Sequence, residues 1–182
     1  DHKRAFDGDL GPNTGGMGAY SPVPQISDEL IQLCVENILE PTAQAMVKEG
    51  IPFTGVLYDG LMLTSEGPKV IEFNARFGDP ETQVVLPRLE SDLVEVLLSL
   101  MEGKKPQLKW GSNAMLGVVV ASKGYPKSST VGAQVPHFKA EQGLQVYYSG
   151  VETNIQGRFI STGGRTYLVG GMGETLEKAH DK

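Results

Sequence analysis

The sequence predicts an α+β fold in which helices and strands share the first part of the chain and a small, mostly-β domain follows. Apolar residues recur at helical spacing in two segments between residues 27 and 103, and two extended segments lie between them. Beyond residue 106 the pattern changes to short extended segments separated by glycine-containing turns. We therefore expect two domains, residues 1–105 and 106–182, which meet at Lys104-Lys105-Pro106.

The composition excludes several classes of function. The 182 residues are 40% apolar and 21% charged, so the chain can bury a core. The formal net charge of −6 gives no electrostatic footprint for nucleic acid or for an anionic membrane. We see no apolar run as long as a membrane span and no secretory signal. The single cysteine, Cys34, excludes a disulfide framework, and a reducing cytoplasm fits this composition best.

Residues 7–24 are rich in glycine and proline, which predicts a loop. Connections usually run to about 4–6 residues, and structureless loops beyond about 12–15 residues tend to be functional or disordered. Consecutive glycines also allow backbone N–H groups to converge on an anion. A plain connecting loop is the alternative, but Ala19 and Tyr20 argue against disorder, and we favour a loop that faces a substrate.

A helix is predicted between Ser27 and Gly50. Ser27 is a good N-cap, acidic residues follow it in the first turn, and glycine is typical just beyond a helix end. Pro41 should kink or divide this helix. Its apolar stripe, which we assign to the core, consists of Leu30, Ile31, Cys34, Val35, Ile38 and Leu39.

Two more helices are expected before the mostly-β domain. Pro80 in the turn Asp79-Pro80-Glu81 suits a first helical position, and the other helix should follow Asp92 and end at Gly103. A last helix should begin near residues 174–180. The strands expected in the mostly-β domain are 115–122, 131–135, 144–151, 158–161 and 165–169. For the turn Thr162-Gly163-Gly164-Arg165 we favour a simple hairpin turn, and the alternative is a contact with a functional site.

Residues 53–64 and 69–75 are expected to form antiparallel strands, and the second of them carries the most informative pattern. Alternate side chains of a strand share a face, so Glu72, Asn74 and Arg76 should lie together. A carboxylate and an amide oxygen suit Mg²⁺ whose other ligands are phosphate and water, and an arginine can bind phosphate bidentately. The alternative is a solvated strand face with a surface ion pair. The opposite face, expected to enter the core, consists of Ile71, Phe73 and Ala75.

Three motifs together resemble one known family. They are Asp9-x-Gly11-Pro12-Asn13-Thr14-Gly15-Gly16-Met17-Gly18-Ala19-Tyr20, Glu72-x-Asn74 and Arg76-Phe77-Gly78-Asp79-Pro80-Glu81. In this order they are similar to the phosphoribosylamine–glycine ligases of the ATP-grasp superfamily, and the similarity runs the length of the chain. The resemblance implies the distal half of an ATP-grasp domain, a β-sheet with flanking helices, in residues 1–105.

The resemblance also implies an activity: ligation of glycine to 5-phosphoribosylamine through glycyl phosphate, with ATP and Mg²⁺ or Mn²⁺, in purine biosynthesis. Glu72 and Asn74 match the family's metal ligands. Arg76, Asp79 and Glu81 match catalytic positions, with Arg76 stabilising the transferred phosphoryl group and the two acids orienting the amine and the ribose. The implied substrate-binding residues are Asp1, Lys3, Asn13, Thr14, Gly15, Gly16, Met17, Gly18 and Pro80.

Two departures from the family pattern lead to further expectations. The family's N-terminal domain and nucleotide-clasping lobe have no counterpart here, so we expect the chain to be part of a longer protein and to be inactive alone. The family's extra acidic ligand on the preceding strand has only Asp59 as a nearby candidate. Two alternatives are another ATP-grasp carboxylate–amine ligase or carboxylase, which would not explain the two long motifs, and a non-catalytic ligand-binding module.

Overall fold

The chain folds into two units, each assembled from segments that are distant in the sequence. The computed structural model describes residues 1–139 and 141–182. The first unit consists of Asp1–Pro22, Asp79–Glu90 and Trp110–Lys182. The second unit consists of Val23–Gly78 and Ser91–Lys109.

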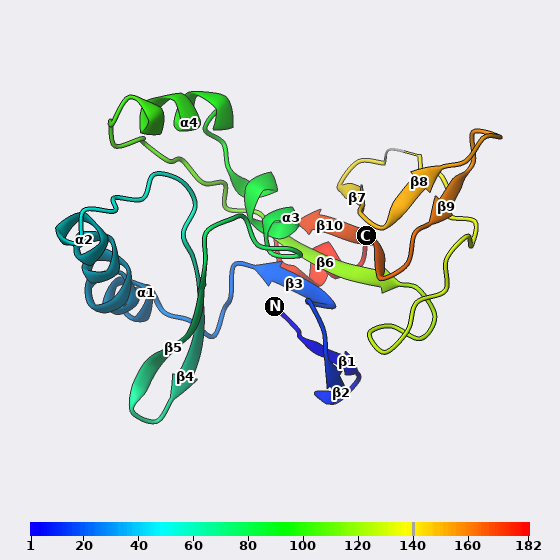
Figure 1. Cartoon of the computed structure of the whole chain (residues 1–182), viewed down its shortest axis with the longest axis horizontal. Helices are drawn as coiled ribbons and strands as arrows, with labels where there is room; N and C mark the ends of the chain where they lie inside the picture. Colours follow the sequence, from blue (N-terminus) through cyan, green and yellow to red (C-terminus); the bar gives the residue numbers. More distant parts are fainter. Residues whose placement is uncertain (140) are drawn as a thin grey trace. The chain divides into compact units, whose positions relative to one another are not determined.

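An antiparallel sheet forms the centre of the first unit, in the order β3-β6-β10-β7 (Figure 1). Its strands are β3 (Gly18–Ser21), β6 (Ala114–Ala121), β7 (Leu144–Tyr148) and β10 (Arg165–Gly173). The core lies where β3 and β6 meet helix α3 (Thr82–Val85), and it contains Ala19, Val84 and the fully buried Met115. Because β3 pairs with β6, sequence from both sides of residue 105 shares one sheet. The domain boundary at residue 105 itself stays a prediction.

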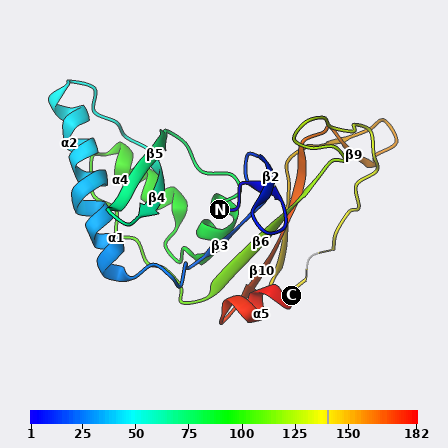
Figure 2. The same ribbon diagram turned by 90° about the horizontal axis from the view of Figure 1, so that it is seen from below.

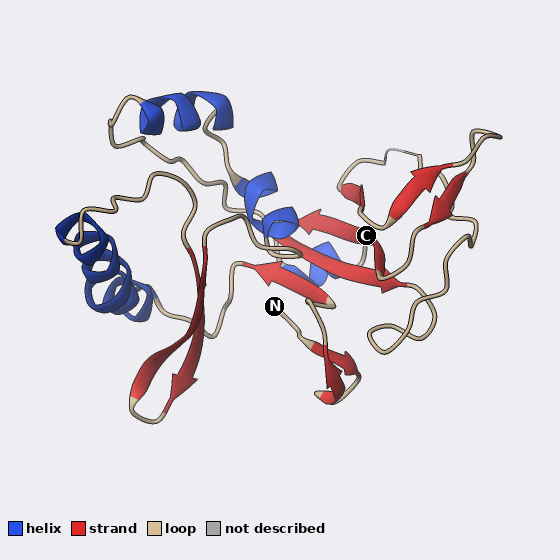
Figure 3. Ribbon diagram, viewed as in Figure 1, coloured by secondary structure: helices blue, strands red, loops and turns tan. Residues whose placement is uncertain are grey.

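Two hairpins and two short helices complete the first unit. The hairpins are β1 (Arg4–Phe6) with β2 (Leu10–Asn13), and β8 (Val151–Thr153) with β9 (Phe159–Ser161), drawn as red arrows in Figure 3. The helices are the 3₁₀ turn η2 (Leu86–Arg88) and α5 (Leu176–His180), which lies beside the end of β10 in Figure 2.

A long helical segment and a hairpin make up most of the second unit. The helical segment consists of α1 (Asp28–Cys34), the π-helical η1 (Val35–Leu39) and α2 (Glu40–Lys48), and the remaining elements are β4 (Tyr58–Thr64), β5 (Gly67–Asn74) and α4 (Leu93–Met101). The predicted N-cap is confirmed, because the Ser27 hydroxyl accepts the Leu30 N–H at 3.3 Å. Pro41 divides the helix as predicted: the wider π turn precedes it, and the Glu40 N–H donates to the Val35 carbonyl.

Four sequence predictions about secondary structure are wrong in part. The segment 7–24 is not one loop, since β2 and β3 lie within it and only residues 14–17 connect them. The strand expected over 53–64 begins at Tyr58. Residues 131–135 contribute a single isolated bridge, Gln134 to Ile160, instead of a strand. Pro80 is not at a first helical position, because α3 begins at Thr82 with Glu81 as its N-cap.

The second unit has little interior of its own. Among its residues, all of which the structure describes, only Gly78 is buried. Ile71 and Phe73, the face of β5 that the sequence analysis assigned to a core, are 62% and 44% exposed. Cys34 and the helical stripe around it are at best half-buried. The apolar side chains therefore alternate as predicted, but no other element of the second unit, which the structure describes in full, covers the apolar faces of β5 and of the helical segment.

None of the helices that the structure describes combines the length and the apolar character needed to cross a bilayer.

Candidate active site

The predicted metal pair lies at the end of the β4–β5 hairpin in the second unit. The ladder places Asn74 opposite Tyr58 and Glu72 opposite Gly60. Glu72 is exposed and Asn74 is half-buried. A side chain at position 60 would begin 3.3 Å from Cγ of Glu72, so the glycine leaves room for the glutamate. One face of the hairpin thus carries both oxygen donors, as the alternation predicts.

The guanidinium of Arg76 is held beside this pair. Its Nη2 donates to Oδ1 of Asn74 at 3.3 Å, and its Nη1 donates to the carbonyl of Phe77 at 2.9 Å. These two contacts fix a permanent positive charge at the end of β5, next to a carboxylate and an amide. Such an arrangement suits a ligand that presents both a cation and phosphate oxygens.

Asp59 does not join this pair. It lies opposite Phe73 in the ladder, and residues opposite each other share a face, so its side chain is on the side away from Glu72 and Asn74. Both carboxylate oxygens are shielded from solvent and have no hydrogen-bond partner among the described residues. Burial raises the pKa of the Asp59 carboxyl, because desolvation disfavours its charged form.

The glycine-rich connection between β2 and β3 belongs to the first unit, and its backbone donors are already engaged. The N–H groups of Thr14 and Met17 donate to the carbonyls of Lys3 and His2, both at 2.7 Å. The Gly16 N–H donates to the Thr14 hydroxyl at 3.0 Å, and the Gly15 N–H donates to Oη of Tyr125 at 3.1 Å. The expectation that this connection offers free N–H groups to an anion is therefore wrong for these four residues.

Close packing explains why two positions of this connection are glycine. Gly16 has φ of +118°, and a Cβ there would lie 2.4 Å from Cδ of Pro80 and 2.8 Å from Oδ1 of Asp1. At Gly18 a Cβ would lie 2.7 Å from the Gly117 carbonyl oxygen, across the β3–β6 ladder. Pro80 itself is fully buried. Three predicted substrate residues, Asp1, Gly16 and Pro80, thus form one packed cluster.

We expect Gly16→Ala to destabilise the full-length protein by about 2 kcal/mol and to lower its Tm by about 5 °C, because strain at positive φ adds to overlap with buried Pro80. A thermal melt followed by circular dichroism measures this. Gly157→Ala is the matched control, since Gly157 has φ of +74° in open space and reports strain alone. Equal losses for the two variants would contradict a role for packing on Pro80.

Asp79 is held from two elements of the first unit. Gln83, on α3, donates from Nε2 to Oδ1 at 2.8 Å. Arg165, the first residue of β10, donates from Nη2 to Oδ2 at 3.0 Å. Each carboxylate oxygen keeps a second lone pair for another donor. Nζ of Lys3 lies 3.6 Å from Oδ2 of Asp1. Glu81, two residues after Asp79, occupies the N-cap position of α3 without a side-chain capping hydrogen bond.

The predicted site residues therefore fall into two sets. Glu72, Asn74 and Arg76 lie in the second unit, and every other predicted residue lies in the first. Sequence reasoning missed Gln83, Tyr125 and Arg165, which hold the first-unit set in place. Gln83 follows Asp79 by four residues at the start of a helix, and this spacing could have indicated their contact. Arg165 is 86 residues away from Asp79, and the sequence favoured a simple hairpin for its turn.

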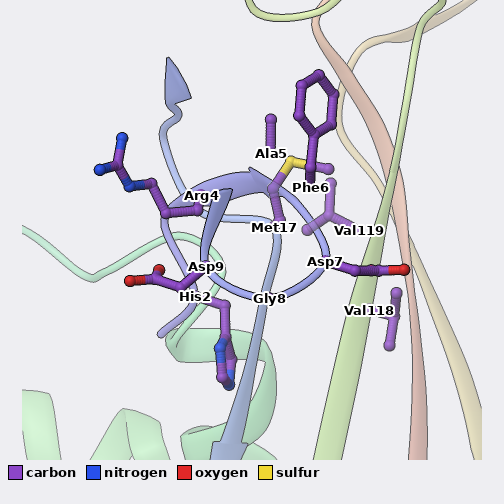
Figure 4. A pocket seen from close by; sticks show the side chains of 10 residues that line it. All are labelled: His2, Arg4, Ala5, Phe6, Asp7, Gly8, Asp9, Met17, Val118 and Val119. Carbon is purple, nitrogen blue, oxygen red and sulfur yellow. The ribbon is translucent and has the colours of Figure 1, made fainter. Parts of the chain in front are cut away.

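A pocket of about 430 Å³ lies beside the β1–β2 hairpin in the first unit (Figure 4). Its lining combines acids with His2 and Arg4, so it does not select an anion. Met17 is the predicted substrate residue that reaches it. The ten lining residues are His2, Arg4, Ala5, Phe6, Asp7, Gly8, Asp9, Met17, Val118 and Val119.

Comparison with known proteins places these features in one family. Residues 1–82 match the model of the phosphoribosylglycinamide synthetase ATP-grasp (A) domain, and residues 115–182 match the model of its C domain. The chain is 56% identical to a phosphoribosylamine–glycine ligase of Lactococcus lactis over 178 residues, which are 97% of this chain and 43% of that protein. It therefore spans less than half the length of this curated relative.

Solved structures agree with these matches. The crystal structure of phosphoribosylamine–glycine ligase from Thermotoga maritima superposes on all of this chain and on 45% of its own, with a TM-score of 0.87 and 35% identity. The biotin carboxylase domain of Hydrogenobacter thermophilus 2-oxoglutarate carboxylase, solved with MgADP, ADP and bicarbonate, covers 91% of this chain and 36% of its own at a TM-score of 0.60 and 12% identity, and shows the fold alone. The chain has the α+β fold of an ATP-grasp fragment and belongs to the phosphoribosylamine–glycine ligase family.

Proposed function

We propose that the full-length protein joins glycine to 5-phosphoribosylamine at the expense of ATP, giving glycinamide ribonucleotide, ADP and phosphate. The observation that carries this proposal is the arrangement of Glu72, Asn74 and Arg76 at the end of β5, in a chain whose relatives are named as such ligases. A carboxylate and an amide oxygen can hold a divalent cation, and that cation together with a fixed guanidinium would supply the charge neutralisation that phosphoryl transfer requires.

The donor set at the end of β5 fits a hard divalent cation. Glu72 supplies a carboxylate and Asn74 an amide oxygen, whose second lone pair remains after the contact with Arg76. Within the described residues no group of three or more His, Cys, Asp or Glu side chains could hold a metal. The two donors therefore suit Mg²⁺ or Mn²⁺ that takes its other ligands from ATP phosphates and water, and the ion would neutralise phosphate charge there.

Phosphoryl transfer is the first proposed step. A carboxylate oxygen of glycine attacks the γ-phosphorus of ATP, and the bond from that phosphorus to the bridging oxygen of ADP breaks. Glycyl phosphate and ADP result. We assign Arg76 to this step: its guanidinium, tied to Asn74 and to the Phe77 carbonyl, can hydrogen-bond to the phosphoryl oxygens while negative charge develops on them.

Amide formation is the second proposed step. The amino nitrogen of 5-phosphoribosylamine attacks the carbonyl carbon of glycyl phosphate, the carbon–oxygen bond to phosphate breaks, and the nitrogen loses a proton. We assign Asp79 and Glu81 to hydrogen bonds with the amine and the ribose hydroxyls, because Asp79 retains free lone pairs after its contacts with Gln83 and Arg165. The packed cluster of Asp1, Gly16 and Pro80 supports the loop that carries these groups.

An omission experiment on the full-length protein tests this proposal. ADP and phosphate release are measured with ATP, glycine and freshly generated 5-phosphoribosylamine, and each substrate is left out in turn. We expect full ADP formation only when glycine and the amine are both present. ADP formation without the amine, or with a different amine, would keep the ATP-grasp chemistry and reassign the substrate. No ATP consumption in any combination would favour a non-catalytic binding module.

A further inference from the structure

Arg165 connects three segments of the first unit that are far apart in the sequence. It is the first residue of β10 and follows the turn at 162–164. Its side chain is 21% exposed. It reaches the Asp79 loop, 86 residues away, and the glycine-rich connection, 149 and 150 residues away. The sequence pattern favours a simple hairpin turn here over a contact with the predicted site, so it does not predict these contacts.

The guanidinium uses both terminal nitrogens. Nη2 donates to Oδ2 of Asp79 at 3.0 Å, and Nη1 donates to the backbone carbonyl of Asp79 at 2.7 Å. Nη1 also lies 3.1 Å from the Gly15 carbonyl oxygen and 3.4 Å from that of Gly16. A planar, permanently charged group with donors in a fixed fork can satisfy a carboxylate and several carbonyls together, which a lysine ammonium cannot match in direction.

We infer that Arg165 is the positioning residue for the amine substrate, because it fixes the Asp79 carboxylate to the Gly15–Gly16 backbone. The inference rests on the proposed ligase function and deepens it. Gln83 fixes the other carboxylate oxygen, so Asp79 has one orientation, and its remaining lone pairs are available to a ligand because the side chain is 45% exposed. Arg165 acts through Asp79 and the loop and touches no reacting atom.

Steady-state kinetics of the full-length protein separate this role from a general one. Arg165→Lys keeps the charge and loses the fork. We expect the KM for 5-phosphoribosylamine to rise about tenfold or more, while the KM values for ATP and glycine change less than about threefold. The matched control is Arg158→Lys, because Arg158 is an exposed arginine of the same unit that lies shortly before Arg165 in the sequence. The control should leave all three KM values unchanged.

A double-mutant cycle supplies a second readout. Since Arg165 acts through Asp79, the effect of Arg165→Lys should shrink to about threefold or less when Asp79→Asn is already present. Asp79→Asn keeps the shape of the side chain and removes its charge, so the cycle stays readable if larger substitutions fail to fold. A fully additive pair, or a uniform change in all kinetic constants of Arg165→Lys, would overturn the inference.

The proposed function and this inference fail in different ways. If the unmodified protein consumes no ATP with glycine and 5-phosphoribosylamine, the proposed function is wrong and the role of Arg165 falls with it. If the unmodified protein is active, and the KM for 5-phosphoribosylamine is the same in Arg165→Lys as in the Arg158→Lys control, only the inference is wrong. A raised KM for the amine alone, with a non-additive cycle, supports both.

Discussion

Asn74→Ala is expected to lower kcat for ADP formation by the full-length protein by about 10³-fold, which corresponds to about 4 kcal/mol. The reason is the loss of one of the two side-chain oxygen donors, Glu72 and Asn74, that we propose for the divalent cation. The same substitution removes the acceptor of Arg76 Nη2, so the guanidinium would lose its hydrogen bond to the side chain at position 74 and keep the one to the Phe77 carbonyl. Both effects weaken charge neutralisation in the transferred phosphoryl group.

Glu72→Gln tests the contribution of the metal ligand separately from that of Arg76. Glutamine keeps an oxygen donor and the length of the side chain but removes the charge, and it leaves the contact between Asn74 and Arg76 in place. We expect both variants to form ADP more slowly than the unmodified protein. Added Mn²⁺ should partly restore the rate of ADP formation for Glu72→Gln and should not restore it for Asn74→Ala. Metal titrations of ADP formation, from micromolar to millimolar, measure this difference.

Asn37→Ala is the matched control for Asn74→Ala. Asn37 is an exposed asparagine of the same unit, on the π-helical segment η1, and nothing in the proposed chemistry uses it. Its variant should keep the full rate and the same metal dependence. A rate for Asn74→Ala within about threefold of this control would show that the end of β5 holds no essential metal, and the phosphoryl-transfer proposal would then lose its main support.

Local signals in the sequence predicted much of the fold. The N-cap at Ser27, the break at Pro41 and the start of α4 after Asp92 follow from side-chain chemistry within a few residues, and each is confirmed. The antiparallel β4–β5 hairpin is also confirmed, and with it the shared face of Glu72 and Asn74. These features depend on contacts between neighbours in the sequence, which spacing can reveal.

Contacts over long sequence distances escaped prediction. The glycine-rich motif suggested an anion-binding nest. In the structure its N–H groups donate to His2, Lys3 and Tyr125 instead, and a run of glycines gives no sign of these distant acceptors. Burial was also misjudged on β5, where alternation predicts which side chains share a face but not what covers it. Arg165 was assigned to a simple turn for the same reason: its partners lie 86 to 150 residues away.

The chain on its own, residues 1–182, is expected to form no ADP when ATP, glycine and 5-phosphoribosylamine are all present. The reason lies in the second unit, which carries the proposed phosphate-binding face but buries only Gly78. Large apolar side chains of α4 remain exposed there, among them Val94 at 64%, Leu98 at 52% and Met101 at 79%. Burial of such side chains stabilises a fold by about 1.5–3 kcal/mol each, so this unit lacks the interior that would hold its hairpin rigid.

The assay compares the isolated chain with the full-length protein at equal concentration, and with the isolated chain that carries Asn74→Ala. Any turnover by the isolated chain that exceeds its Asn74→Ala version would show that the hairpin positions ATP without further sequence, and the expectation would be wrong. An apolar dye should bind the isolated chain more strongly than an equal molar amount of the full-length protein, because the exposed faces of α4 and β5 are accessible in the former. Equal dye binding with no turnover would assign the inactivity to a missing nucleotide contact rather than to a missing core, since the family relatives extend over more than twice the length of this chain.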